Sequence, residues 1–215
     1  MIYRFSVLLF VSFLFSAAVS AQKPFTEGTI VYKVKLQTAD HREYIGLYTF
    51  VFKGSQMKKC LKLSNGYEDI VLYNCKTKAV YSLQNRDGKK FAIQLSMDEY
   101  IKSQAKFTNF KLKNEKDGGK KIAGYTATKG EVAYNDGSVS EITYTKEWYP
   151  AQSITFERFP DAKFFPLTFS YTDLQGMTME FEAIQILTEP IENSIFRIPP
   201  DYKIISYDEY KELSR

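Results

Sequence analysis

The stretch that decides the fold runs from Pro166 to Ile186 and reads P-L-T-F-S-Y-T-D-L-Q-G-M-T-M-E-F-E-A-I-Q-I. Apolar and polar residues alternate on both sides of the segment from Asp173 to Gly176, whose composition is typical of a turn. The pattern predicts a β-hairpin with one apolar and one polar face. The apolar face must be covered by a second sheet, a helix or an apolar ligand.

Two further segments predict strands of the same sheet. Gly28 to Leu36 alternates apolar and polar residues, which is typical of a strand with one buried face. Glu43 to Lys53, E-Y-I-G-L-Y-T-F-V-F-K, is apolar on both faces and predicts a central strand covered on both sides. Shorter runs separated by turn residues continue to Leu95 and resume at Phe107, a spacing typical of an antiparallel meander.

Two capping boxes predict short helices among these strands. The first, Ser96-Met97-Asp98-Glu99, predicts a helix from about Met97 to Lys106 that lies against the sheet. The second begins at Ser206 and predicts a terminal helix from Tyr207 to Leu213. The phenylalanine-rich segment from Pro150 to Phe165 predicts a long loop or short helix and is a candidate lid. We therefore expect a mainly β fold with a few helices.

The N-terminal segment, residues 1–21, has the features of a signal peptide. Arg4 precedes a short apolar run, and Val19 and Ala21 stand at the positions that a signal peptidase reads. No cysteine follows the expected cleavage site after Ala21, so lipid attachment there is not expected. Residues 22–215 contain no linker and predict a single domain, exported to the periplasm or secreted.

The charge pattern gives little support to a highly charged partner. The formal net charge is +4, and no motif of a nucleic-acid-binding fold is present, so we expect no nucleic acid. The run from Lys111 to Lys121 mixes both signs and predicts a solvated hairpin tip. The alternative is a patch that makes peripheral contact with a membrane or binds an acidic partner.

Residues that could support catalysis are few. The chain has one histidine, His41, in a polar turn, and no pattern of zinc ligands or nucleophile elbow. Glu180 and Glu182 lie on the same side of a strand, but alternation with apolar residues indicates a solvated face. We expect no enzymatic activity, no metal and no cofactor, and a hydrolase that uses His41 is the least favoured hypothesis.

The two cysteines, Cys60 and Cys75, form an even pair in an exported chain, which predicts a disulfide. They lie on strands expected to be neighbours, and closing a loop of about 15 residues would contribute about 3 kcal/mol of stability. The alternative is that Cys60, between Lys58 and Lys62, is a free thiol of lowered pKa.

Five short motifs extend over nearly the whole mature chain and together resemble a known family. They resemble a family of exported Gram-negative proteins of unknown function that is similar in architecture to the LolA/LolB-type periplasmic lipoprotein carriers. The motifs are F-T-E-G-T-I-V-Y (Phe25 to Tyr32), K-I-A-G-Y-T-A (Lys121 to Ala127), K-E-W-Y-P (Lys146 to Pro150), F-P-L-T-F (Phe165 to Phe169) and R-I-P-P-D-Y-K (Arg197 to Lys203).

This resemblance implies an unclosed half-barrel, in which a curved antiparallel sheet wraps over one or more helices around a hydrophobic concavity. The helix from Met97 would be one plug of that concavity. The candidate lining residues are aromatic or apolar: Tyr48, Phe50, Phe52, Met97, Ile101, Phe169, Tyr171, Met177, Met179 and Phe181.

Two functions follow from these expectations, and the sequence leaves both open. In the first, a non-enzymatic protein binds a lipid, a lipoprotein acyl chain or another apolar ligand in the half-barrel. In the second, the protein is an interaction module for other envelope proteins, whose core is filled by its own elements and whose strand edges bind the partner. Ordinary β-core packing would account for the aromatic and methionine residues in the second case.

Overall fold

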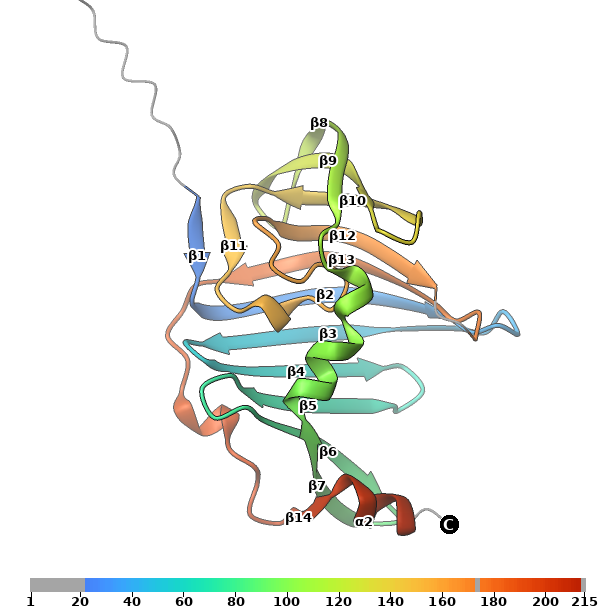
Figure 1. Cartoon of the computed structure of the whole chain (residues 1–215), viewed down its shortest axis with the longest axis vertical. Coiled ribbons are helices and arrows are strands. Elements are labelled where there is room, and N and C mark those ends of the chain that lie inside the picture. The colour runs from blue at the N-terminus through green and yellow to red at the C-terminus, as the bar shows by residue number, and fades with distance from the viewer. Residues whose placement is uncertain (1–21, 173–174, 214–215) are drawn as a thin grey trace, which may run out of the picture.

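A single curved sheet of 12 strands makes up most of the protein (Figure 1). The structure is a computed structural model, which describes residues 22–172 and 175–213; the signal peptide expected at residues 1–21 lies outside the described residues. In spatial order the strands are β14 (Lys203–Ser206), β7 (Lys89–Ser96), β6 (Ala79–Arg86), β5 (Glu68–Asn74), β4 (Gln56–Leu63), β3 (Glu43–Lys53), β2 (Glu27–Gln37), β13 (Thr178–Leu187), β12 (Phe165–Thr172), β10 (Val139–Thr145), β9 (Tyr125–Ala133) and β8 (Lys111–Ile122).

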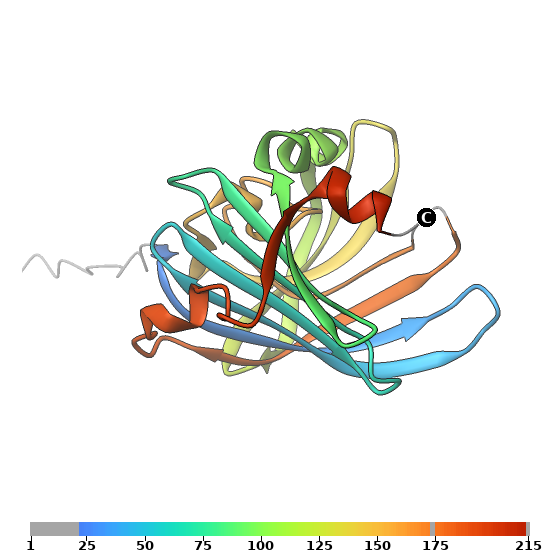
Figure 2. The ribbon, with the colours of Figure 1, turned by 90° about the horizontal axis from the view of Figure 1, so that it is seen from below.

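The sheet is antiparallel except at one end, where β14 pairs with β7 in parallel. Its end strands, β8 and β14, are not paired with each other within the described residues, so the barrel is unclosed. Figure 2 shows the sheet curved into a trough with helix α1 over its open side. The predicted fold class, a mainly β half-barrel with a few helices, is confirmed.

The predicted hairpin is also confirmed and lies next to the centre of the sheet. β12 pairs with β13 so that Phe169 is opposite Phe181 and Tyr171 is opposite Met179. β13 then pairs with β2, which buries alternate residues as its sequence pattern predicts. These strands therefore turn their apolar faces toward the concave side of the trough.

Strand β3 is central, as predicted, but the expectation that it is covered on both sides is wrong over part of its length. Ile45 is 57% exposed and Leu47 is 46% exposed on the convex side, whereas Val51 is buried. The convex side is covered elsewhere, because Ile198 and Tyr202, which follow the short helix η3 (Asn193–Phe196), pack against a cluster on β5, β6 and β7. That cluster consists of Leu72, Leu83 and Ala92.

Three elements cover the concave side of the sheet. Helix α1 (Met97–Ser103) begins at Ser96, whose side chain accepts a hydrogen bond from the Glu99 amide, as its capping box predicts. The expected helix to Lys106 ends earlier, and the turn η1 (Ala105–Phe107) follows it. The third element is the irregular segment 151–164, which contains the turn η2 (Ser153–Thr155).

The first and last described elements adjoin this framework. β1 (Lys23–Phe25) pairs in parallel with β11 (Trp148–Pro150) as a separate two-stranded sheet. At the other end, helix α2 (Tyr207–Glu212) has the complete capping box predicted for Ser206 and Glu209.

The basic run from Lys111 to Lys121 is not a hairpin tip. It is most of β8, an edge strand whose pairing with β9 shifts register twice. The turn residues Gly118 and Gly119 produce a bulge in the strand instead of ending it, since pairing resumes at Lys121. The lysines therefore lie along an exposed sheet edge.

The predicted disulfide does not form, because the register of β4 and β5 separates the two cysteines. Cys60 is opposite Ile70, whereas the Cys75 amide donates to the carbonyl of Ser55, five residues away along the chain. Five residues of strand span about 16 Å, and a disulfide needs Cα atoms within about 7 Å. The odd separation also places the two thiols on opposite faces of the sheet, and both are free.

Candidate functional site: the concave face

The concave face brings together nine of the ten residues that the sequence predicted as cavity lining. Ile101 is the exception, since it is 47% exposed and lies outside the main apolar cluster. Tyr100, next to it on α1, packs on the cluster in its place. Of the nine, Phe50, Phe52, Met97, Met179 and Phe181 are buried, and Tyr48, Phe169, Tyr171 and Met177 are half-buried.

Five of these residues form a continuous aromatic surface, which we call the aromatic floor: Tyr48, Phe50, Phe169, Tyr171 and Phe181. The rings of Phe169 and Phe181 are stacked with centres 4.5 Å apart, and Tyr171 stacks on Phe181 at 5.7 Å. Tyr48 connects this stack to Phe50, at 6.0 Å from Phe181 and 4.5 Å from Phe50. The floor therefore extends across the strands from β12 to β3.

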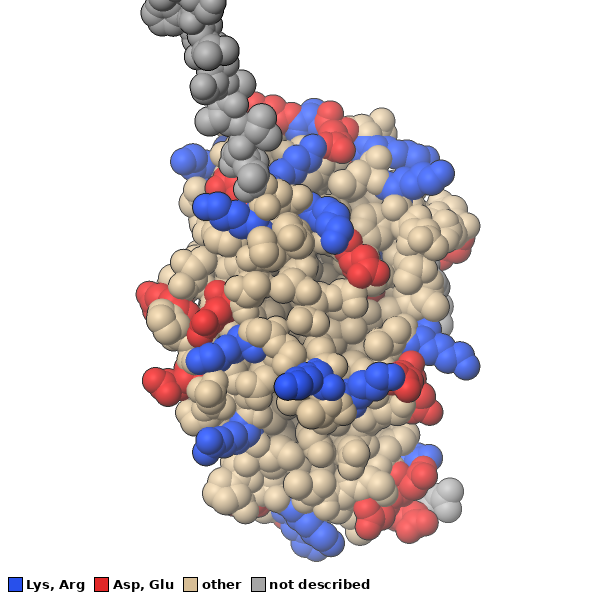
Figure 3. Space-filling view, turned by 60° about the vertical axis from the view of Figure 1, so that its left-hand side comes forward, with Lys and Arg blue, Asp and Glu red and all other residues tan. Residues whose placement is uncertain are grey.

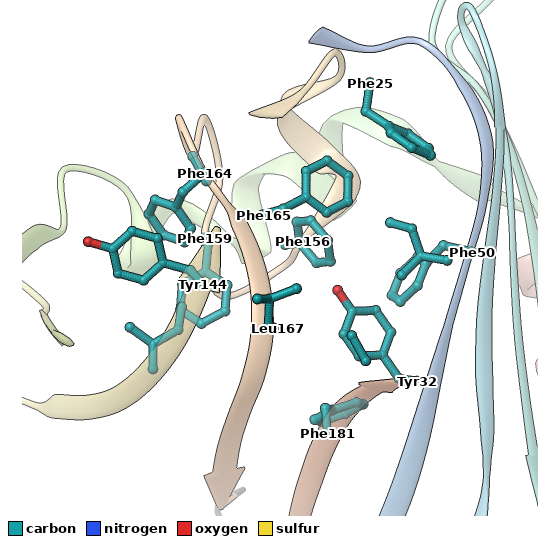
Figure 4. Packing of buried hydrophobic residues seen from close by; sticks show 14 of the residues in the cluster. Phe25, Tyr32, Phe50, Tyr144, Phe156, Phe159, Phe164, Phe165, Leu167 and Phe181 are labelled. Carbon is teal, nitrogen blue, oxygen red and sulfur yellow. The ribbon is translucent and has the colours of Figure 1, made fainter. Parts of the chain in front are cut away.

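The irregular segment 151–164 lies inside the trough, and we call it the plug. Its apolar side chains are buried: Ile154, Phe156, Phe159, Ala162 and Phe164. Figure 4 shows Phe156 between Phe165, Phe50 and Tyr32, with ring centres 5.5, 5.5 and 6.4 Å away. The segment predicted as a candidate lid is thus a loop whose side chains occupy the concavity.

Very little empty space remains between the plug and the aromatic floor. A cavity of about 40 Å³ lies there, lined by residues that include Tyr48, Phe159 and Phe169. This volume is far below the roughly 300–1,000 Å³ that is typical of ligand pockets. In this conformation the plug covers the aromatic floor, and the larger pocket of about 860 Å³ lies beside it, lined in part by Phe159 and Tyr171.

A few polar contacts connect the plug to the sheet. The hydroxyl of Tyr134 donates to the carbonyl of Arg158 at 3.0 Å, and the side-chain amide of Gln152 donates to the carbonyl of Gly54 at 3.3 Å. The guanidinium of Arg158 lies over the ring of Tyr171, 4.2 Å from its centre. Within the plug, the backbone bonds are short-range turns, such as Phe159 N to Phe156 O at 3.0 Å.

The most unusual side chain in this region is Lys59 on β4, which is only 2% exposed. Its Nζ donates to Tyr100 Oη at 2.9 Å, to the Ile154 carbonyl at 3.3 Å and to Glu157 Oε1 at 3.5 Å. Burial lowers the pKa of Lys59 below its ordinary value, and Glu157 opposes that shift. Lys59 was not predicted from the sequence, although its parity with Met57 and Leu61 in an alternating strand places it on the inner face.

Two carboxyl groups accompany Lys59. Glu157, with a side chain 49% exposed, accepts a hydrogen bond from Tyr100 Oη at 2.9 Å. Burial acts to raise the pKa of Glu157, but Lys59 and Tyr100 outweigh it and lower the pKa overall. Asp69 on β5 accepts from Gln84 at 3.4 Å, and burial, followed by the charge of Glu157, raises its pKa. The site therefore combines an apolar floor with one buried cation and two acids.

The residues considered for catalysis do not gather at this site. His41 is exposed in the turn between β2 and β3, and Glu180 and Glu182 are exposed on β13, as the alternation predicts. Over the described residues there is no group of three or more His, Cys, Asp and Glu side chains placed to hold a metal ion. Cys60 is not a thiol of lowered pKa, because burial and then Glu68 raise its pKa.

The outer surface carries both signs of charge. A shallow trough of about 750 Å³ on the convex side is lined by residues that include Lys33, Lys35, Glu180 and Glu182, and Lys35 pairs with Glu43 at 2.7 Å. Figure 3 shows lysine, arginine and acidic side chains interspersed on the face that carries β1, around an uncharged area. Neither region is a patch of purely positive or purely negative charge.

Comparisons with known proteins find matches among solved structures alone. No family model and no curated protein matches the chain. Among solved structures, the chain is similar to a LolA superfamily protein from Nitrosomonas europaea, with 12% identity and a TM-score of 0.40 over 82% of this chain and 92% of that one. None of the helices in residues 22–172 and 175–213 is long and apolar enough to cross a membrane.

Proposed function

We propose that the protein binds an apolar or amphiphilic ligand, such as the acyl chain of a lipid or a lipoprotein, on the concave face of its sheet. The ligand takes the place of the plug, and no reaction is catalysed. With the signal peptide expected at residues 1–21, the protein would act in the periplasm or outside the cell.

The observation that carries this proposal is the plug itself. The aromatic floor is covered by a segment with little regular structure, held by five apolar side chains and a few hydrogen bonds. Burying the four larger of these side chains contributes about 1.5–3 kcal/mol each, and Ala162 adds less. An acyl chain of about 16 carbons gains a similar total at about 0.8 kcal/mol per CH₂. The free energy gained by burying an acyl chain is therefore close to that lost when the plug leaves, so the exchange can be reversible.

The half-buried part of the aromatic floor supplies a point of entry. Tyr48, Phe169 and Tyr171 are partly accessible beside the plug, whereas the rings beneath Phe156 are buried. An apolar chain can make its first contacts on these three rings before the plug moves. This arrangement supports uptake from one end of the trough.

A second candidate function is the interaction module, and the cavity of only about 40 Å³ favours it. In this alternative the plug is a permanent part of the core, and the edge strands β8 and β14 bind an envelope protein by strand addition. The lysines along β8 discourage indiscriminate pairing at that edge, so such a partner would be acidic.

The test combines direct detection with uptake by the mature protein, residues 22–215. We expect native mass spectrometry and organic extraction to show about one lipid per chain, and a fluorescent probe, 12-(9-anthroyloxy)stearate, to bind with saturation. Phe169→Asp on the aromatic floor should abolish probe binding. Ile45→Asp on the convex side, at a position 57% exposed, is the matched control and should bind as wild type.

Far-UV circular dichroism must first show that both variants are folded. A folded Phe169→Asp variant that binds the probe normally would contradict the proposal. An empty wild-type protein that also fails to bind the probe would favour the interaction module.

A further inference from the structure

Lys59 belongs to the sheet, but its hydrogen-bond acceptors belong to the elements that cover the sheet. The ammonium group is fixed to β4, in the middle of the sheet. Its three oxygen acceptors all belong to the covering elements: Tyr100 to α1, and Ile154 and Glu157 to the plug. Displacement of the plug would therefore remove two of the three acceptors and leave the cation on the sheet.

The sheet offers Lys59 little in their place. The rings of Tyr73 and Phe50 have their centres 5.0 and 5.6 Å from Nζ and provide cation–π contacts. Asp69 is a carboxyl group on the same inner face, but it accepts its hydrogen bond from the side-chain amide of Gln84. With the plug displaced, Tyr100 Oη is the one of these three acceptors that remains, and a buried ammonium group left so poorly compensated costs several kcal/mol. A purely apolar ligand would incur this cost, and a ligand with an anionic oxygen group would avoid it.

We propose that the ligand is a long-chain carboxylic acid, whose carboxylate replaces that of Glu157 at Lys59 while its chain lies on the aromatic floor. This inference rests on the proposed function and names the substrate class of the same site. The replacement exchanges one carboxylate for another, so the charge beside Lys59 is conserved. Tyr100 Oη, which donates to Glu157 at 2.9 Å, can donate to the carboxylate of the ligand in the same way.

The dimensions of the floor suit one acyl chain. From Lys59 the ring of Phe50 is 5.6 Å away, and Tyr48, Phe181 and Phe169 continue the path to β12. The path crosses four strand spacings, from β4 through β3, β2 and β13 to β12, which is about 19 Å. An acyl chain spans about half of a hydrocarbon core of roughly 30 Å, so a long chain covers most of this path.

The experiment compares two probes that differ only at the head group: 12-(9-anthroyloxy)stearate and its methyl ester, each titrated below its aggregation limit. We expect the wild-type protein to bind the acid at least tenfold more tightly than the ester. Lys59→Met should remove this preference while retaining affinity for the ester. Lys58→Met, the next residue on the same strand but on the opposite face, is the control and should keep the preference.

A second variant tests the exchange of carboxylates without changing Lys59. Glu157→Gln removes the competing carboxylate of the plug, and we expect it to raise the affinity for the acid severalfold. Equal binding of acid and ester by wild type, or a preference that survives Lys59→Met, would overturn the carboxylate assignment while leaving apolar binding intact. Failure of wild type to bind either probe would overturn the proposed function together with this inference.

Discussion

Lys59 is a buried charge next to a surface of aromatic side chains, so its desolvation is the main electrostatic cost of folding at the concave face. The attraction within a buried ion pair often fails to offset the cost of removing its charges from water. Replacing such a pair by apolar residues of similar volume is therefore often neutral or stabilising by about 1–4 kcal/mol. Glu157 can remain solvated without its partner, since its side chain is 49% exposed. A buried lysine that contributes so little to stability is consistent with the proposed binding role.

Lys59→Met should change how the stability of the protein depends on pH. Burial lowers the pKa of Lys59 in the folded state, so the unfolded chain binds the proton more tightly. The contribution of Lys59 to the free energy of unfolding therefore rises with pH toward its ordinary pKa of about 10.4. We expect urea unfolding from pH 7 to 9.5 to show wild type gaining stability relative to Lys59→Met.

The difference should be small or favour the variant at pH 7. Lys58→Met, which leaves the buried lysine in place, controls for the loss of one positive charge. A difference between wild type and Lys59→Met that does not change over this pH range would contradict the burial of a charged amine.

The two cysteines provide a second test at the scale of residues. Cys60 and Cys75 lie on opposite faces of the sheet, so the exported protein should contain two thiols even after oxidative folding. We expect iodoacetamide to add two groups to the denatured, unreduced protein. Prior reduction should give the same mass. Addition of no groups before reduction and two afterwards would show a disulfide and contradict the register of β4 and β5.

At the scale of elements, periodicity decides what the sequence could predict. The β12–β13 hairpin and β2 were predicted correctly because alternation of apolar residues reports a strand with one buried face. The plug has no period to detect, so its three phenylalanines could not be assigned to the interior from spacing alone. Its fit between Tyr32 and Phe50 depends on contacts between residues more than 100 positions apart.

Two predictions from the sequence were wrong because the features depend on tertiary contacts: the cover of β3 and the pairing of the cysteines. The convex side of β3 has the apolar pattern of a covered strand, yet the cover lies over β5 to β7, where the C-terminal segment happens to pack. Cys60 was placed on the correct strand, β4, but Cys75 lies one residue beyond the end of β5, and the register that separates the two depends on the turn between those strands. The same alternation places Lys59 on the inner face of β4, so its burial could have been predicted from the sequence.

The plug should open more easily than the sheet to which it is bound. Its backbone bonds are isolated turns, whereas β2 is paired along its length on both sides. Hydrogen exchange should therefore show free energies of opening about 2 kcal/mol or more lower for plug amides than for those of β2. Phe156→Ala, which removes a buried ring, should increase plug exchange by a further tenfold or more.

Leu83→Ala is the control for this experiment, since Leu83 is buried on the convex side, away from the plug. It should reduce the stability of the sheet without selectively increasing exchange in the plug. Equal opening free energies for the plug and β2 in wild type would mean that the plug cannot leave alone, and this would count against ligand exchange.

At the scale of the whole molecule, one sheet supports two different surfaces. The concave surface is apolar and carries the plug, and the convex surface is largely polar, with both signs of charge. Because every strand from β14 to β8 is bonded to the next, the trough has no internal boundary at which it could divide into domains. We therefore expect that movement of the plug exposes the interior with less disruption of the sheet than separation of its strands.

This continuity predicts that the two sheets unfold in one cooperative transition. Trp148, the only tryptophan of the chain, lies in the small β1–β11 sheet, and Phe25 connects that sheet to the main core. The ring centre of Phe25 lies 5.7 Å from Trp148, 5.1 Å from Phe165 and 5.6 Å from Phe52. Tryptophan fluorescence should therefore report the small sheet, while far-UV circular dichroism reports mainly the large one.

We expect the two signals to give the same unfolding midpoint in the wild-type protein. Phe25→Ala removes the shared ring, which should cost about 3–5 kcal/mol and lower the fluorescence midpoint below the circular dichroism midpoint, because the small sheet loses its main attachment. Phe91→Ala, in the separate cluster beside β14, should lower both midpoints together. Separate midpoints in the wild-type protein would contradict this coupling, since β1 and β11 would then unfold independently of the trough.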